Sequence, residues 1–149
     1  MKLEHLLKAY KQNGLNVKLK DMSDEAECAG VITFDNGISA AYLLDKEEIV
    51  ISMKLFCNCL TGNGLTISNQ LTHTIKILNI IKISISLLCN ISEKECNMIL
   101  ESLGMFDGTL SAGKQIRHLE HSYKLEVIDG LLSLSIAEIP PIKSQGKTS

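Results

Sequence analysis

The chain has 149 residues, of which 45% are apolar and 4% aromatic, and its formal net charge is −2. This length and apolar content predict one domain with a single core and exclude a chain that is disordered throughout. The absence of Trp and of a net basic charge argues against a nucleic-acid-binding protein.

Charge is unevenly distributed over the first 50 residues. Residues 1–20 contain five lysines and one glutamate, a formal charge of +4, whereas residues 21–50 contain eight carboxylates and one lysine, a formal charge of −7. This pattern is typical of an ordinary solvated surface. A second interpretation is an acidic face that repels nucleic acid and anionic membranes.

The chain begins with a predicted amphipathic helix over residues 3–13. Its apolar residues share one helical face: Leu3, Leu6, Leu7 and Tyr10. Gly14 fits the position just past the helix, where Leu15 can make a hydrophobic contact. Residues 17–20 alternate apolar residues with lysine, which indicates a short strand or an extended segment, and residues 21–27 are expected to form an acidic loop.

A three-stranded meander is predicted over residues 30–55. Strong turn residues at 35–37 and a charged turn at 45–48 separate segments of period-two alternation. On this pattern one face carries Ile38, Ala40, Tyr42, Leu44, Ile49, Ile51, Met53 and Leu55. The opposite face carries Val31, Ala41, Leu43 and Val50, joined later in the chain by Leu131.

Two helices are predicted after a loop at 58–64. The first, at 68–88, has an apolar stripe of Leu71, Ile75, Leu78, Ile81, Ile85 and Leu88. Residues 81–88 also alternate with period two, so a strand stays open there, although the length of the segment favours a helix. The second helix starts at a capping box, Ser92 to Glu95, presents Cys96, Ile99, Leu100 and Leu103, and ends at Gly104.

A second hairpin is predicted over residues 123–137, with its turn at 129–130. The preceding residues 115–122 are polar and have no clear assignment, and residues 105–114 are expected to be a glycine-rich loop. The predicted fold class is therefore α+β: an N-terminal helix, a three-stranded antiparallel meander, one or two central helices and a C-terminal β-hairpin in one antiparallel sheet. The predicted domain is 1–139, followed by a disordered tail at 140–149.

Candidate chemistry is sparse. Cys57 and Cys59, with His73, His118 and His121, are residue types that bind zinc, but their spacing matches no standard zinc site. Cys28 and Cys96 are candidate nucleophiles in settings that do not favour catalysis, and the glycine-rich segments 62–64 and 104–113 lack the spacing of a phosphate-binding motif. The sequence predicts no catalytic residues, no metal site, no cofactor and no enzyme activity.

The five cysteines are an odd number at irregular spacing, which is typical of reduced thiols rather than of a disulfide framework. No secretory signal is recognisable near the first residue, and the most apolar stretch, 75–88, is short and contains two lysines. A soluble, cytoplasmic protein without membrane contact is expected.

The segment from Leu3 to Leu55 resembles the class I type III secretion chaperones, which bind effector proteins before their export. The amphipathic helix LEHLLKAY, the following Gly14, the acidic loop and the three consecutive strands GVITFDNGISAAYLLDKEEIVISMKL carry this resemblance. The chain departs from that family after its last strands, where the family continues with a further helix and this chain has Pro140 and Pro141.

The resemblance implies a homodimeric chaperone that holds an extended segment of a client protein along apolar grooves and sheet edges, without ATP. The partner-binding residues expected on this basis are Leu3, Leu7, Tyr10, Val31, Thr33 and Phe34. The alternative function is a small regulatory or immunity-type protein that inhibits one folded partner through its acidic surface at 21–27. Whether the outer sheet face is covered within one monomer stays open.

Overall fold

The computed structural model describes residues 1–24, 27–34, 38–58, 67–104, 113–128 and 131–139. The predicted turns at 35–37 and 129–130, most of the predicted loop at 58–64 and the predicted tail at 140–149 lie outside the described residues. So does most of the predicted loop at 105–114.

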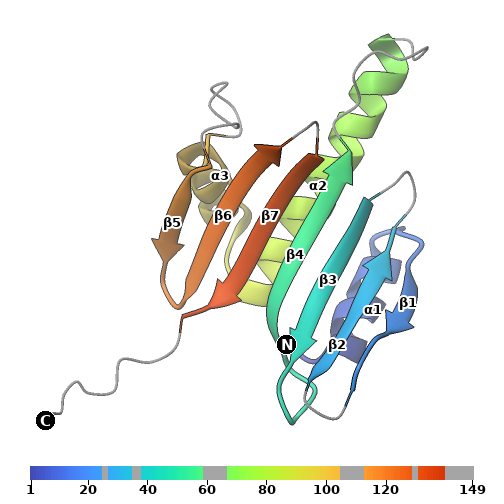
Figure 1. The fold of residues 1–149 in the computed structure, drawn as a ribbon. Helices are drawn as coiled ribbons and strands as arrows, with labels where there is room; N and C mark the ends of the chain where they lie inside the picture. Colours follow the sequence, from blue (N-terminus) through green and yellow to red (C-terminus); the bar gives the residue numbers. More distant parts are fainter. Residues whose placement is uncertain (25–26, 35–37, 59–66, 105–112, 129–130, 140–149) are drawn as a thin grey trace, which may run out of the picture.

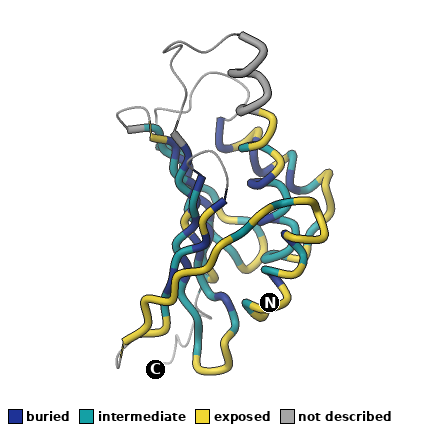
Figure 2. Tube along the Cα trace, turned by 90° about the vertical axis from the view of Figure 1, so that its right-hand side faces the viewer, coloured by how far each residue is buried: buried dark blue, intermediate teal, exposed yellow. Residues whose placement is uncertain are grey.

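The described helices and strands form one antiparallel sheet with helices on one face (Figure 1). Their bounds are α1 Leu3–Gln12, β1 Lys18–Asp21, β2 Cys28–Thr33, β3 Ile38–Leu44, β4 Val50–Asn58, α2 Ile67–Cys89, α3 Glu93–Ser102, β5 Gln115–His118, β6 His121–Ile128 and β7 Leu131–Glu138. The seven strands lie in the order β1-β2-β3-β4-β7-β6-β5. The predicted α+β class is confirmed. Figure 2 shows the helices together on one side of the sheet, with the buried residues between the two layers.

Local sequence explains how α1 ends. Gly14 has a φ of +80°, which favours glycine, and its amide donates to the carbonyl of Lys11 over 3.0 Å. The amide of Leu15 donates to the carbonyl of Tyr10 over 3.1 Å. These two bonds form a Schellman motif, which satisfies the last carbonyls of the helix and turns Leu15 back toward the core.

The N-terminal half of the sheet has one strand more than the predicted meander. β1 pairs with β2, so that β2 is an internal strand and β1 forms the edge. Residues 17–20 indicated either a strand or an extended segment, and the structure shows a strand of four residues whose side chains are all exposed. A strand this short gains its order from pairing with β2 rather than from its own sequence.

A β-bulge between β3 and β4 changes which residues of β4 face the core. Leu43 pairs with Ser52 but Leu44 pairs with Val50, so Ile51 is an extra residue in β4. Val50 is 4% exposed, which makes its predicted place on the outer face wrong. Strict alternation fails here because the extra residue reverses the orientation of every side chain that precedes it.

α2 settles the ambiguity of residues 81–88, which are helical. Its buried residues are spaced by three and four: Ile81, Ser84 and Ile85 are all 0% exposed. Ile75 was predicted to belong to the same buried stripe, but it is 51% exposed. The helix begins beyond the end of the sheet, so its first turns have no strand beneath them (Figure 1).

α3 follows its predicted capping signal. The Ser92 hydroxyl accepts a hydrogen bond from the Glu95 amide over 3.2 Å. The predicted apolar face of Cys96, Ile99, Leu100 and Leu103 is buried. Gly104, with a φ of +84°, ends the helix as predicted.

The C-terminal hairpin is confirmed as β6 and β7, and the unassigned residues before it add the edge strand β5. β7 pairs with β4, which joins the two halves of the sheet in its centre. The described core is therefore continuous across both halves, with Leu55 of β4 opposite Leu134 of β7.

A polar contact in the core fixes α1 against α2. The Tyr10 and Ser84 hydroxyl oxygens lie 2.5 Å apart, and Ser84 also donates to the Ile80 carbonyl over 2.7 Å. The Tyr10 hydroxyl also lies 3.7 Å from the Met53 sulfur, which is a weak acceptor. Burial raises the pKa of Tyr10 well above its usual range, so the phenol stays protonated.

We expect removal of the Ser84 hydroxyl and removal of the Tyr10 hydroxyl to destabilise the protein by different amounts. Ser84→Ala leaves the Tyr10 hydroxyl with the sulfur alone and should lower the free energy of unfolding by about 1–3 kcal/mol. Tyr10→Phe leaves Ser84 bonded to its own helix and should cost about 1 kcal/mol. Urea unfolding of both variants and of the double variant gives the coupling energy, and equal, additive losses would contradict the assigned contact.

Candidate functional site

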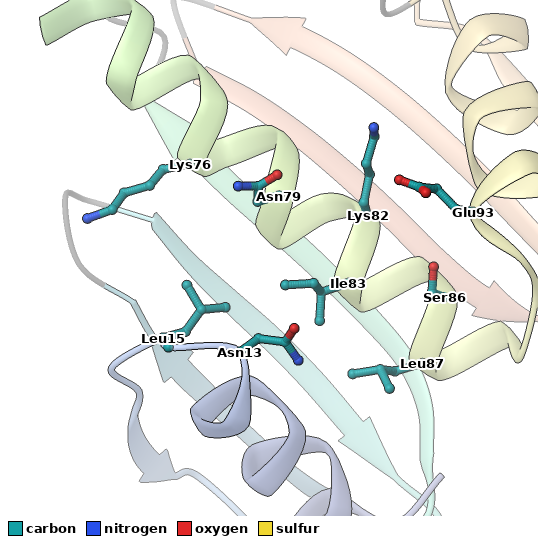
Figure 3. Close-up of a pocket in the computed structure, with 10 residues that line it drawn as sticks. Asn13, Leu15, Lys76, Asn79, Lys82, Ile83, Ser86, Leu87 and Glu93 are labelled. Atoms are coloured by element: carbon teal, nitrogen blue, oxygen red, sulfur yellow. The ribbon is translucent and has the colours of Figure 1, made fainter.

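A groove runs between the end of α1 and the exposed side of α2. It has a volume of about 640 Å³ and an apolar floor made by Leu15, Ile83 and Leu87 (Figure 3). Its rim is polar and is lined by Asn13, Lys76, Asn79, Lys82, Ser86 and, from the first turn of α3, Glu93. We call this site the α1–α2 groove. An apolar floor with a polar rim is suited to an amphipathic segment of another protein.

A second cleft, of about 530 Å³, adjoins the first through Gly14 and Leu15. It is lined further by Lys11, Asn16, Val17 and Lys18, and so reaches the start of the edge strand β1. The two clefts together extend from α3 to one edge of the sheet. An occupant in extended conformation can therefore contact both the helical layer and β1.

The sequence of α2 explains why this groove is apolar. Ile81 and Ile85 are buried toward the sheet, whereas Ile83 and Leu87 are half-buried and line the groove. The period-two alternation of residues 81–87 thus reflects a helix with two apolar faces and not a strand. The second apolar face lies next to the contact of Ser84 with Tyr10 of α1, and Ile83 and Leu87 are partly buried at the edge of that contact. Their remaining apolar surface is available to a further apolar side chain.

The predicted partner-binding residues do not form one surface. Tyr10 is 0% exposed and Phe34 is 4% exposed, and their rings meet edge to face with centroids 4.9 Å apart. Leu3 and Leu7 are half-buried and pack against the core on the helical side. A partner cannot reach Tyr10 or Phe34 in this fold, because both side chains fill the core.

Val31 and Thr33 lie on the opposite side of the sheet. Val31 is half-buried and Thr33 is exposed, and both point away from the buried Ile32 between them. Their strand, β2, is internal, so it cannot pair with an added strand. The groove residues Leu15, Ile83 and Leu87 were not predicted to bind a partner. The alternation within 81–87 was a signal that could have identified Ile83 and Leu87.

The residues considered for zinc binding are dispersed. Cys57 pairs with Leu132 of β7, whereas His121 pairs with Glu138, so the two side chains are separated by about 20 Å along the strands. His118 bonds instead to Glu95 of α3 over 3.1 Å. Cys59 lies outside the described residues. Within the described part of the chain, no group of three or more His, Cys, Asp or Glu residues is arranged to hold a metal ion.

Two of the described thiols are buried in the fold, and two carboxylates of the acidic loop hold its backbone. Burial raises the pKa of Cys89 to about 11 and also raises the pKa of Cys96, so both thiols stay protonated at neutral pH. Hydrogen bonds from Ser23 lower the pKa of Asp21. In the acidic loop, Asp21 and Asp24 accept hydrogen bonds from the amides of Ser23 and Glu27, both over 2.8 Å, which stabilises the loop backbone.

Among the described helices, no single one is long and apolar enough to span a membrane, although α2 and α3 pass that test as a pair bent by 114°. Much of the apolar surface of this pair is buried against the sheet.

No family model, no curated protein and no solved structure matches this chain.

Proposed function

We propose that this protein is a non-enzymatic protein-binding module that holds an extended segment of a client protein in the α1–α2 groove. The observation that supports this most directly is the second apolar face of α2, where Ile83 and Leu87 line an open groove together with Leu15. These side chains pack against the core on one side and keep part of their apolar surface exposed in the groove. A client segment that buries them would gain hydrophobic free energy.

The wider proposal is a cytoplasmic chaperone of the secretion type that acts as a homodimer. The one-sided α+β sheet and the resemblance of its first 55 residues support this proposal. In this proposal the client binds in the α1–α2 groove, and not at Tyr10 and Phe34, which are buried. The alternative, inhibition of a folded partner through the acidic loop, has less support because Asp21 and Asp24 are engaged in hydrogen bonds within the loop.

Peptides selected from a random phage-displayed library against the native protein test the proposal. The selected peptides should bind in solution, measured by fluorescence anisotropy, with weak salt dependence because the floor is apolar. Asn79→Trp places a large ring in the groove at an exposed helical position and should weaken binding about tenfold or more.

Ser102→Trp is the matched control, because Ser102 is also exposed on a helix but does not line the groove. It should bind like the unmodified protein. Failure to select any peptide, or peptides that bind Asn79→Trp and Ser102→Trp equally well, would exclude the groove as the client site. Binding that decreases steeply with salt and depends on Asp21 or Asp24 would favour the folded-partner inhibitor.

A further inference from the structure

The face of the sheet opposite the helices is a second surface without a cover among the described elements (Figures 1 and 2). Strand register identifies its side chains, because residues directly opposite each other in antiparallel strands point to the same side. Val31, for example, lies opposite Ala41, which lies opposite Lys54, and all three point away from the core. We call this surface the open face.

The charges on the open face have one predominant sign. By register, the five basic side chains on it come from four different strands, and a single described carboxylate, that of Glu126, accompanies them. The basic residues are Lys18, Lys20, Lys54, Arg117 and Lys124. The whole chain has a formal net charge of −2, so its acidic residues are concentrated elsewhere. The fold therefore separates the charges of a nearly neutral chain.

Three of these lysines lie in one row across the sheet. The row runs from Lys20 through Val31 and Ala41 to Lys54, and then through Ser135 to Lys124. Lys20 and Lys54 are three strand spacings apart, about 14 Å, and Lys54 and Lys124 are two strand spacings apart, about 10 Å. A segment that lies across the strands can meet all three ammonium groups, of which that of Lys124 is also paired with the Glu126 carboxylate over 3.6 Å.

Small and hydroxyl side chains occupy the space between the charges. Register places the following on the open face: Thr33, Ser39, Ala41, Ser52, Ser122, Ser133, Ser135 and Ala137. With the apolar Val31, Leu43 and Leu131 among them, these side chains make a surface rich in hydroxyl donors. Carboxylate groups accept hydrogen bonds from hydroxyls and ion pairs from lysines, so both features favour an anionic occupant.

Other occupants fit this surface less well. The segment 140–149 carries Lys143 and Lys147 and no acidic residue, so it does not complement a basic face. A second copy docked face to face would bring like charges together. Proteins that bind single-stranded nucleic acid commonly stack its bases on aromatic rings, and Phe56 is the one described aromatic on this face; the Lys54 ammonium lies over its ring, 5.4 Å from its centre.

We propose that the open face binds an acidic, extended polypeptide segment, by charge complementarity across the row of Lys20, Lys54 and Lys124. This site is separate from the α1–α2 groove, which lies on the other side of the sheet. The two can engage one client at two places, because Lys18 belongs both to the open face and to the cleft beside β1.

A labelled peptide of alternating Glu and Ser tests this proposal with the full-length protein. Fluorescence anisotropy should show binding that weakens steeply as salt rises, and no binding of a matched Lys/Ser peptide. Lys20→Gln and Lys54→Gln should each weaken binding roughly twofold to fivefold. Lys94→Gln, on the exposed side of α3, is the matched control and should have no effect.

The groove variants separate this proposal from the proposed function. Asn79→Trp should leave binding of the Glu/Ser peptide unchanged, and Lys54→Gln should leave the groove-selected peptides unaffected. If the Glu/Ser peptide no longer bound Lys76→Gln but still bound Lys54→Gln, the proposal would be overturned, because the peptide would then bind in the groove.

Two further results would also overturn it. Tighter binding of an oligo-dT of similar length would assign the open face to nucleic acid. The second result is a solution mass that increases with protein concentration at low salt and no longer does so in Lys54→Gln. It would show that the open face binds an acidic region of a second copy.

Discussion

Replacing Ile85 with alanine should lower the free energy of unfolding by about 2–5 kcal/mol. Ile85 is 0% exposed and lies in the C-terminal part of α2, where its side chain belongs to the buried core. Truncation removes buried methyl groups and leaves a cavity that the surrounding close-packed side chains fill only in part. Urea unfolding, followed by circular dichroism, measures this loss, and an unchanged m-value would show that the same surface is exposed on unfolding.

Ile75→Ala provides the control, since it makes the same chemical change in the same helix. Ile75 is 51% exposed, and its truncation should change the stability by less than about 0.5 kcal/mol. The sequence pattern alone places both residues in one buried stripe and predicts similar losses. A large loss for Ile75→Ala would show that α2 packs along its whole length, contrary to this structure.

Gly30→Ala should destabilise the protein by about 2 kcal/mol although it adds a single methyl group. Gly30 pairs with Tyr42, and a Cβ atom at Gly30 would meet the Tyr42 ring and would lie 2.7 Å from the backbone oxygen of Lys20. The ring can move only into a packed core, and the carbonyl belongs to the paired strand β1. The methyl group therefore displaces either Tyr42 or the edge strand.

Ala29→Val adds more volume at the neighbouring position and is the control for this prediction. Ala29 is half-buried on the open face, where the strand accommodates a β-branched residue, so the change should stay within about 0.5 kcal/mol. Thermal unfolding monitored by circular dichroism compares the two. If Gly30→Ala were as stable as the unmodified protein, the close approach of Tyr42 to Gly30 would be wrong.

The two surfaces proposed for binding differ in how they would affect a client. The α1–α2 groove buries apolar side chains and should determine how long a segment stays bound. The open face presents charges on exposed side chains and should mainly raise the rate of encounter with an acidic segment. Salt dependence of the association and dissociation rates therefore distinguishes their contributions.

Local sequence determined the elements whose signals act over a few residues. The Schellman motif at Gly14 needs one residue with positive φ, and the cap at Ser92 needs one hydroxyl within reach of the third amide of α3. The alternation in β3 and in the hairpin of β6 and β7 likewise follows from their own residues. Such features depend on geometry within one turn or one strand pair, so they can be recognised before the fold is known.

Tertiary structure decided the features that depend on distant residues. The bulge at Ile51 reversed the face on which Val50 lies, and the packing of α2 leaves Ile75 of the predicted stripe exposed. The groove requires Leu15 of the segment after α1 to lie beside Ile83 and Leu87 of α2.

The basic row exists only because strand order places lysines of β1, β4 and β6 on one line. Periodicity tells which residues share a face, whereas long-range packing selects which face is covered and which residues from other elements lie next to it.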